Sequence, residues 1–332
     1  MAQPPLHAWS ALRGDARPLS GGLINDTYVV GNPPQAVVQR LHSVFGPRVN
    51  EDIDAITQHL EAQGLMTPRL LRTDSGDAWV EDDGIWRALS WVEGVTHHKL
   101  DSTDLAAEAG KLVARWHQAT EDLKHDFAFS RPLAHDTKHH ISVLVNALHQ
   151  HNDHRLAATV RPLAHEILGD WARWSGRTDH PTRIAHGDLK ISNLRFSADG
   201  KGLCLLDLDT MGPLSLDVEL GDAWRSWCNP ATEDDPDVRF DLDLFAASAE
   251  GYLSERPLHP EVRETLPLGV QRICLELAAR FAADALSESY FGWDPERFAT
   301  RGEHNLARAQ GQFRLARSVR AQIPEMRRIL EV

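Results

Sequence analysis

The sequence contains few cysteines, and their placement excludes two kinds of small scaffold. Among 332 residues there are three cysteines, Cys204, Cys228 and Cys274, an odd number at wide spacing. A disulfide framework requires an even and dense set of cysteines, and a zinc cluster requires closely spaced pairs. We therefore expect neither, and a reducing cytoplasmic location suits such a chain.

Long hydrophobic runs and a basic surface are also missing. The most apolar segment, residues 270–286, is interrupted by Arg272, Glu276 and Arg280, whereas a membrane span needs about 18 or more consecutive apolar residues. The N-terminus lacks the apolar core of about 7–15 residues that marks a signal peptide. A net charge of −13 argues against a nucleic-acid surface. We expect a small-molecule partner, no membrane or nucleic acid, and a monomer or homodimer.

The first part of the chain is rich in strand patterns. Residues 26–30 and 36–41 flank the turn sequence GNPP and predict a hairpin. Residues 47–64 carry apolar side chains at helical spacing and stop at a glycine. Residues 78–94 predict two strands joined at Asp83-Gly84.

After Gly94 the pattern becomes helical. Residues 102–120, 139–151 and 163–175 predict helices, the first with Ser102 or Thr103 as its cap. Because 332 residues exceed what one hydrophobic core usually holds, we expect two lobes. We place the boundary after residue 93, with a nucleotide-binding lobe over 1–93, a catalytic and substrate-binding helical lobe over 94–332, and a cleft between them.

The segment HGDLKISN, residues 186–193, joins several chemical groups in one loop. Gly187 permits an unusual turn. Asp188 can accept a proton, Lys190 can neutralise anionic charge, and Asn193 can offer a carbonyl oxygen to a hard cation. Each residue alone is more often a simple turn or cap residue.

A second acidic turn follows in LCLLDLDT, residues 203–210. Asp207 ends an apolar strand, and Asp209 points the same way if the strand continues. Two carboxylates together with an amide oxygen are ligands suited to Mg²⁺.

The two turns together match a known arrangement. The pattern H-x-D-L-K-x-x-N, followed by an apolar strand ending in D-x-D, corresponds to the kinase catalytic loop H-R-D-x-x-x-x-N and the metal-binding aspartate that follows it. Gly187 stands in place of the arginine. The pattern predicts transfer of the γ-phosphoryl group of ATP, with GTP as an alternative, to a substrate hydroxyl.

The H-G-D-x-x-x-x-N variant resembles the aminoglycoside phosphotransferase and choline kinase superfamily. Segments 205–225, 21–30, 279–291 and 303–318 are most similar to the N-acetylhexosamine 1-kinases. This resemblance implies an α+β, bilobal, protein-kinase-like fold, with an antiparallel sheet and a helix in a small N-lobe and a larger, mostly helical C-lobe. It also implies ATP and Mg²⁺ as cofactors.

The kinase pattern assigns roles to the loop residues. Asp188 would act as the base that accepts or orients the hydroxyl, and Lys190 would stabilise charge on the transferred group. Asn193 and Asp207 would hold Mg²⁺. Asp209 would be a second metal ligand or a substrate contact.

The resemblance also predicts the nucleotide contacts in the N-lobe. Arg40 stands where the superfamily carries a lysine on the third strand, and it would contact the phosphates. An acid on the following helix, Glu51 or Asp52, would pair with it, although both also suit a helix N-terminus. The remaining expected contacts are the Gly21-Gly22 turn for the phosphates and the backbone of Trp91, Val92 and Glu93 for adenine.

The substrate is expected to be a sugar or amino sugar, with the anomeric hydroxyl as one candidate acceptor. Asp222 and Arg225 could contact it, or could pair with each other three positions apart on a helix. One alternative is a kinase of a cationic alcohol, such as an aminoglycoside, a choline-like compound or homoserine. An alternative of another class is a non-catalytic, nucleotide-binding, pseudokinase-like regulator.

Overall fold

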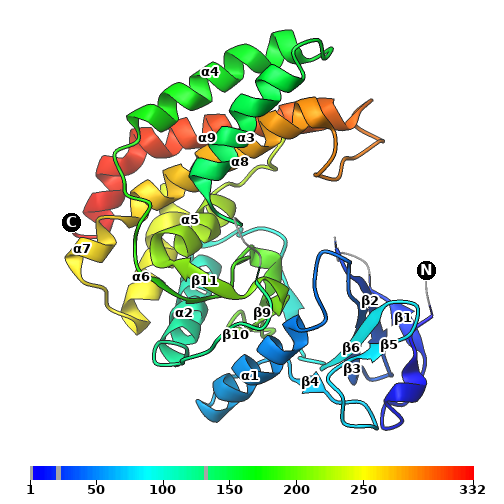
Figure 1. The fold of residues 1–332 in the computed structure, drawn as a ribbon. Coiled ribbons are helices and arrows are strands. Elements are labelled where there is room, and N and C mark those ends of the chain that lie inside the picture. Colours follow the sequence, from blue (N-terminus) through cyan, green and yellow to red (C-terminus); the bar gives the residue numbers. More distant parts are fainter. Residues whose placement is uncertain (1–2, 20–23, 131–133) are drawn as a thin grey trace.

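The computed structural model describes residues 3–19, 24–130 and 134–332, which form a small N-terminal part and a larger helical part (Figure 1). The N-terminal part contains a six-stranded antiparallel sheet in the order β1-β2-β3-β6-β4, with β5 paired to β6. Its strands are β1 (Ala16–Pro18), β2 (Asp26–Val30), β3 (Ala36–Arg40), β4 (Leu70–Leu71), β5 (Val80–Glu81) and β6 (Ile85–Ser90).

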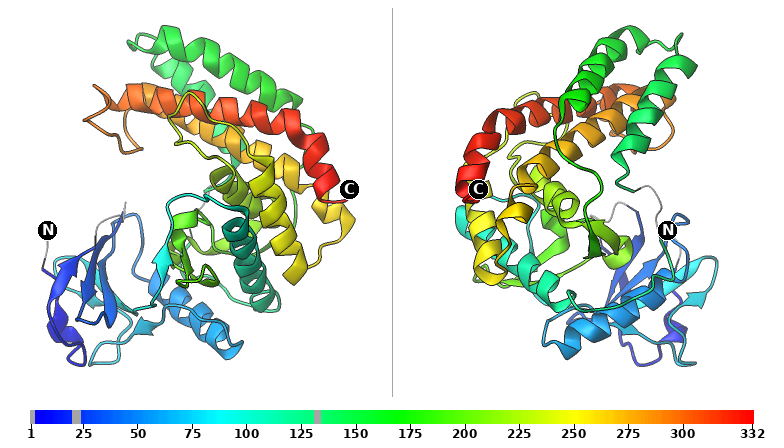
Figure 2. Two further views of the ribbon diagram at one scale, coloured as in Figure 1. Left: turned by 180° about the vertical axis from the view of Figure 1, so that it is seen from behind. Right: turned by 60° about the vertical axis from the view of Figure 1, so that its left-hand side comes forward.

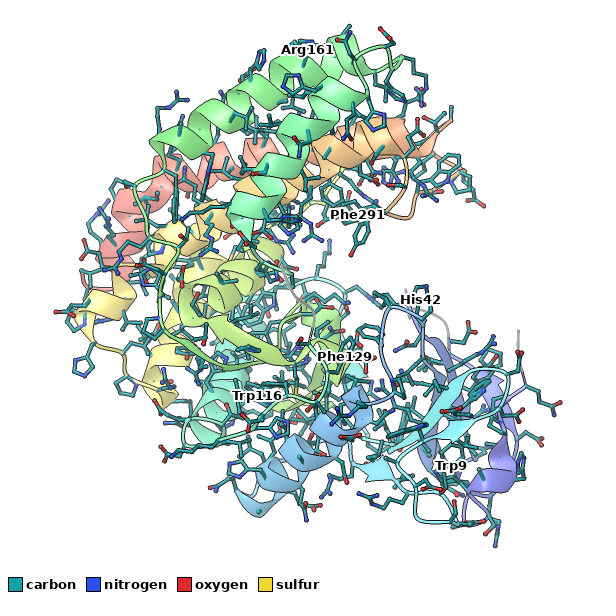
Figure 3. The ribbon with its side chains drawn as sticks, viewed as in Figure 1. Trp9, His42, Trp116, Phe129, Arg161 and Phe291 are labelled. Atoms are coloured by element: carbon teal, nitrogen blue, oxygen red, sulfur yellow. The ribbon has the colours of Figure 1, made fainter. Side chains whose placement is uncertain are left out.

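The two faces of this sheet have different neighbours, because side chains alternate along each strand. One face contributes Val38 and Trp86 to a buried cluster with Trp9, which follows the short helix η1 (Leu6–Ala8) (Figure 3). The opposite face carries the facing pair Gln39 and Arg87. Leu89 lies on this face too, in the main core that also includes residues of α1 (Val49–Ala62).

In the larger part, α3, α4, α5 and α9 pack on the helix α8, which is buried along most of its length, and α2 packs against α6. The views in Figure 2 show the packing of α9 on α8. The helices are α2 (Thr103–Ala119), α3 (Thr137–Gln150), α4 (Ala157–Arg173), α5 (Leu216–Trp227), α6 (Leu242–Glu255), α7 (Pro260–Arg263), α8 (Leu266–Ser287) and α9 (Arg301–Ile329). As the sequence predicts, Ser102 caps α2 by accepting a hydrogen bond from Leu105 N.

Two small sheets hold the acidic turns. One has the order β10-β9-β7 and the other pairs β11 with β8, all antiparallel. The first turn leads into β9 and the second leaves β10, so both turns lie at the same end of the β9–β10 pair. The elements are β7 (Val95–Thr96), β8 (Thr182–Ala185), η2 (Ile191–Asn193), β9 (Leu194–Phe196), β10 (Gly202–Leu205), η3 (Leu208–Thr210) and β11 (Gly212–Ser215).

This architecture confirms the predicted fold class, an N-terminal antiparallel sheet with one helix followed by a mostly helical part. All six strands of the first sheet precede residue 93, and the division of the chain at that residue stays a prediction. The three cysteines are buried and unpaired. Within the described ranges, no helix has the length and apolar character needed to cross a membrane.

Candidate active site

Gly187 shapes the first turn of the site. Its φ is +78°, a conformation that favours glycine, and an added Cβ would overlap the carbonyl oxygen of Thr210. Any other residue here would have to push the two acidic turns apart. This close approach explains why the arginine of the kinase pattern is replaced by glycine in this chain.

His186 ties the two turns together. Its Nε2 lies 2.8 Å from the Leu206 carbonyl, and its Nδ1 accepts a hydrogen bond from Asp188 N at 3.3 Å. Because a carbonyl oxygen only accepts, the proton is on Nε2 and both ring nitrogens are used within the site. Thr210 Oγ1 also donates to the His186 carbonyl, at 2.9 Å. These contacts support a bracing role for His186 and leave the base position to Asp188.

Glu219, on α5, binds the backbone of the first acidic turn at His186 and Gly187. Its carboxylate accepts hydrogen bonds from the backbone N–H groups of His186, at 2.6 Å, and Gly187, at 3.3 Å. His117 Nε2 lies 3.1 Å from the other carboxylate oxygen, and its Nδ1 lies 2.8 Å from the Tyr252 hydroxyl. Burial lowers the pKa of His117 to about 4, so this histidine is neutral near pH 7 and donates to Glu219 through Nε2–H.

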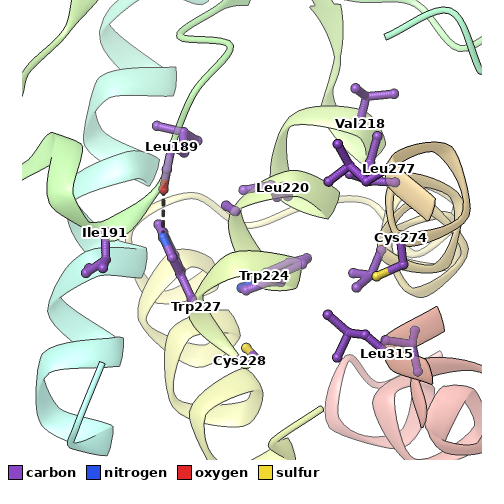
Figure 4. Packing of buried hydrophobic residues seen from close by; sticks show 14 of the residues in the cluster. Leu189, Ile191, Val218, Leu220, Trp224, Trp227, Cys228, Cys274, Leu277 and Leu315 are labelled. Carbon is purple, nitrogen blue, oxygen red and sulfur yellow. Dashed lines mark hydrogen bonds between the residues drawn. The ribbon is translucent and has the colours of Figure 1, made fainter. Parts of the chain in front are cut away.

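Trp227 holds Leu189, the residue that follows Asp188 in the loop. Trp227 Nε1 donates to the carbonyl of Leu189 at 2.7 Å, and both side chains lie in the main core (Figure 4). Leu189 and Ile191 are buried on either side of Lys190. The two buried neighbours thus anchor the loop, while the side chain of Lys190 between them is partly exposed.

Three charged side chains project together from the two turns. Lys190 Nζ lies 2.7 Å from a carboxylate oxygen of Asp188 and 3.8 Å from one of Asp207. Burial alone would lower the pKa of Lys190, but the charge and hydrogen bond of Asp188 and the charge of Asp207 raise it. Their side chains are 28–40% exposed, so a substrate can reach a lysine cation placed between two carboxylates.

Asn193 and Asp207 fit the predicted metal-binding role. Asn193 Nδ2 donates to the Asp188 carbonyl at 2.8 Å, which directs the amide of Asn193 into the turn, and Leu206 N donates to the Asn193 carbonyl at 2.7 Å. Asp207 adopts the left-handed conformation, with φ 58° and ψ 61°. Among the described residues, no group of three or more His, Cys, Asp or Glu side chains could hold a metal ion. Two oxygen ligands suit Mg²⁺, which completes its shell with phosphate oxygens and water.

Asp209 lies in a different environment from Asp207. Its side chain is fully buried, and both carboxylate oxygens accept hydrogen bonds from the guanidinium of Arg87. Asn25 Nδ2 donates to it as well, at 2.7 Å. Both carboxylate oxygens of Asp209 are thus occupied by donors from the N-terminal part of the chain. Of the three proposed metal ligands, Asn193 and Asp207 are therefore better placed than Asp209.

Arg40 does not face the acidic turns. It pairs with Trp86 in the β3–β6 register, whereas its neighbour Gln39 pairs with Arg87, so Arg40 and Arg87 lie on opposite faces of the sheet. The guanidinium of Arg40 contacts the carbonyl and carboxylate of Asp83 in the β5–β6 turn. The alternation of side chains along β3 turns Arg40 away from the face that carries Arg87, and its phosphate contact stays a prediction.

Neither Glu51 nor Asp52, the two candidate acids on α1, pairs with Arg40. Glu51 forms an ion pair with Arg48, at 3.1 Å. The carboxylate of Asp52 accepts hydrogen bonds from the backbone N–H groups of Ala128 and Phe129 and contacts His125 Nε2 at 2.7 Å. Asp52 thus fastens the connection after α2 to α1, and the expected Arg40–acid pair is absent from the described structure.

The other predicted nucleotide contacts stay predictions. Gly21 and Gly22 lie outside the described residues. In the connector after β6, Trp91 N donates to the Gln35 carbonyl at 3.1 Å. Arg195 Nε donates to the Val92 carbonyl at 3.2 Å. These two backbone groups are therefore already engaged, while Glu93 is exposed.

Asp222 and Arg225 pair with each other on α5. Two guanidinium nitrogens of Arg225 lie 2.9 and 3.0 Å from one carboxylate oxygen of Asp222, and a third lies 3.1 Å from Glu233. The charge of Asp222 also acts on Lys190, where it contributes to the raised pKa. The intrahelical pair, one of the two alternatives for these residues, is therefore observed. Because Asp222 acts on Lys190, contact of this pair with a substrate stays a prediction.

Arg87, Gln39, Asn25 and Glu219 were not identified from the sequence as site residues. Arg87 had a recognisable signal, because an arginine inside the apolar strand IWRALS must find a buried partner. Glu219 had no such signal in the sequence, because its role depends on contacts with His186 and His117, about thirty and one hundred positions earlier.

The sequence of the chain matches a known family over most of its length. Residues 15–258 match the profile of the phosphotransferase enzyme family. The chain belongs to this family. The match includes both acidic turns and the whole N-terminal sheet, which confirms the superfamily predicted from the H-G-D-x-x-x-x-N loop.

Individual relatives of this phosphotransferase family member are distant. Homoserine kinase from Methylobacterium radiotolerans is 27% identical over 233 residues, 68% of this chain and 65% of the relative, so the match spans slightly less than two thirds of that protein. An aminoglycoside phosphotransferase from Alicyclobacillus acidocaldarius superposes with a TM-score of 0.63 at 16% identity, over 98% of both chains. The amicoumacin kinase hAmiN, solved with AMP-PNP and Ca²⁺, gives a TM-score of 0.60 at 12% identity, over 93% of this chain and 88% of that one.

These comparisons support the fold and the family but not the finer resemblance. At such low identities the solved structures show the shared fold alone. The homoserine kinase match gives no support to the expected closeness to N-acetylhexosamine 1-kinases, and a sugar substrate gains no support from it either.

Proposed function

We propose that this protein is an ATP-dependent kinase that phosphorylates a hydroxyl group on a small molecule carrying an amine. The observation that carries the proposal is the cluster in which Lys190 lies between Asp188 and Asp207, beside Asn193. This is the set of groups that phosphoryl transfer requires for positioning and for charge neutralisation.

Each residue of the cluster has a role in this proposal. Asp188 accepts a hydrogen bond from the substrate hydroxyl, orients it and takes its proton late in the transfer. Lys190 stabilises the negative charge of the transferred phosphoryl group. Asn193 and Asp207 would hold Mg²⁺, which would supply positive charge to neutralise the phosphates. The hydrogen bonds of His186 and Glu219 keep Asp188 in place.

The charges around the loop favour an amine-bearing substrate. The carboxylates of Asp188, Asp207 and Asp222 all act on Lys190, and Arg225 is already paired with Asp222 and Glu233. A cationic group near these acids gains attraction that a neutral sugar lacks. Homoserine and aminoglycosides, named in the matched proteins, both carry an amine. Amino sugars remain within this class.

A substrate panel tests the proposal. The purified protein is incubated with Mg²⁺ and either ATP or GTP, together with homoserine, aminoglycosides, choline-like alcohols, amino sugars or neutral sugars. Nucleotide consumption measures turnover, and phosphorus NMR identifies the phosphorylated oxygen. We expect turnover with an amine-bearing alcohol, and faster turnover with ATP than with GTP.

The variant Asp188→Asn is the control for this panel. It should abolish turnover and retain nucleotide binding, because the amide keeps the shape but cannot accept the proton. Full activity in this variant would remove Asp188 from its assigned role. Turnover of neutral sugars alone would refute the substrate class, and nucleotide binding with no turnover on any compound would favour a pseudokinase-like regulator.

A further inference from the structure

Asp209 is a buried acid, and among the described residues its three hydrogen-bond donors all come from the N-terminal part of the chain. Arg87 Nη2 donates to one carboxylate oxygen at 2.9 Å, and Arg87 Nη1 contacts the other. Asn25 Nδ2 donates at 2.7 Å. Asp209 itself belongs to η3 in the larger part, two residues after the candidate metal ligand Asp207.

The donors connect Asp209 to several elements of the N-terminal part. Arg87 is in the middle of β6, and its Nε and Nη2 also donate to Gln39 on β3, at 3.0 and 2.7 Å. Arg87 Nη1 lies 3.4 Å from Asn50 Oδ1 on α1. Asn25 immediately precedes β2, and its Oδ1 accepts a hydrogen bond from His42 N at 2.9 Å. A single carboxylate therefore joins the turn after β10 to three strands and a helix.

Asp207 needs such support because its backbone conformation is unfavourable. A non-glycine residue with φ 58° persists only when its surroundings hold it in place. On one side, Leu206 is held by hydrogen bonds to Asn193 and His186. On the other side, Asp209 is the residue that reaches across to the N-terminal sheet.

We propose that Asp209 and Arg87 form an interlobe latch that positions Asp207, and with it the metal, against the nucleotide-binding part. Asp209 is then a positioning residue that acts through the backbone of η3, and it is not itself a metal ligand. The inference rests on the proposed function, because it assumes that Asp207 serves a metal–nucleotide complex. It differs from the sequence expectation for Asp209, and the two can be distinguished by experiment.

The physical reason for coupling is the burial of both charges. A buried ion pair that loses one partner leaves an uncompensated charge, which must find water by opening the contact. Loss of either partner should therefore release η3 from the N-terminal sheet in the same way. A direct metal ligand would behave differently, since its loss would weaken metal binding whether or not Arg87 is present.

The test is a double-mutant cycle of Arg87→Gln and Asp209→Asn, read by calorimetric binding of a non-hydrolysable ATP analogue with Mg²⁺. This readout needs no substrate and no turnover, so its outcome is separate from that of the kinase assay. We expect each single variant to weaken binding about tenfold and the double variant to be within about twofold of the singles, because residues in one interaction are not additive.

Two controls complete the cycle. Asp83→Asn removes the partner of Arg40 on the opposite face of the sheet and should leave binding unchanged. Asn25→Ala removes one donor but keeps the ion pair, so it should fold even if the cycle variants do not, and we expect it to weaken binding about threefold.

Three results would overturn the latch. The first is weaker binding in Asp209→Asn with unchanged binding in Arg87→Gln, which would indicate a direct ligand. The second is a double variant whose loss is the product of the two single losses. The third is unchanged binding in both single variants or, if neither folds, in Asn25→Ala.

Discussion

Arg40 and Arg87 lie on opposite faces of the same sheet, although each is an arginine on one of two paired central strands. Arg87 is buried and contacts the turn after β10, whereas Arg40 is partly exposed and contacts Asp83. Of the two, only Arg87 is on the face that carries Gln39 and that meets the catalytic part of the chain.

Replacement of Arg40 should therefore have little effect on nucleotide binding. We expect Arg40→Ala to change the KM for ATP by less than about twofold, because its side chain lies on the face of the sheet opposite Arg87 and pairs with the exposed Asp83. Steady-state kinetics at saturating Mg²⁺ measure this value. A tenfold rise in KM would instead place Arg40 at the phosphates, as its sequence position suggests.

Removal of the Asp207 charge should reduce metal-dependent activity. Metal coordination contributes several kcal/mol to charge stabilisation, so we expect Asp207→Asn to lower kcat/KM by roughly 10²–10³-fold. A titration of rate against Mg²⁺ should also shift to higher concentration. The matched control is Asp199→Asn, which changes an exposed acid in the β9–β10 turn and should leave both measurements unchanged.

Gly187 and Gly200 form a matched pair for testing the close approach of the two turns. Both have positive φ, at +78° and +82°, but an added Cβ has open space at Gly200 and overlaps the Thr210 carbonyl at Gly187. We expect Gly200→Ala to cost about 1–2 kcal/mol of stability from backbone strain alone. Gly187→Ala should cost more and should also lower kcat. Equal denaturation midpoints and full activity in both variants would contradict this account.

Glu219 should matter for activity through the loop that it supports. Hydrogen bonds to a charged acceptor contribute about 1.5–3 kcal/mol each, so Glu219→Gln should destabilise the protein by a similar amount and lower kcat as Asp188 loses its position. Urea unfolding and steady-state kinetics measure the two effects. Glu250→Gln, an exposed change on α6, should affect neither quantity.

His117 predicts a pH dependence of stability. Its pKa is lowered from 6.5 to about 4 by burial, so below pH 6.5 the unfolded chain binds a proton that the folded chain does not. The contribution of His117 to the free energy of unfolding is therefore complete above pH 6.5. It falls by up to about 3 kcal/mol as the pH is lowered from 6.5 toward 4. The free energy of unfolding of His117→Gln, measured between pH 7 and 4, should fall less steeply than that of the unchanged protein. Parallel curves would show that His117 does not contribute.

Much of the fold could be predicted from local patterns. The hairpin of β2 and β3, the helix α1 with its apolar spacing and the Ser102 cap of α2 were all visible in the sequence and are confirmed. Such features depend on neighbours within a few positions, where propensity and periodicity act directly. The two acidic turns were recognisable for the same reason, because each is a short continuous segment.

The partners of the buried charges could not be predicted in this way. The sequence by itself determined which residues form the two acidic turns, since their spacing and flanking apolar strands are local properties. Only the tertiary structure decided that Arg87, and not Arg40, meets Asp209, and that Glu219 holds the His186 turn. The physical reason is that a buried charge must find a partner, and which partner is near depends on strand register and helix packing between residues far apart in the chain.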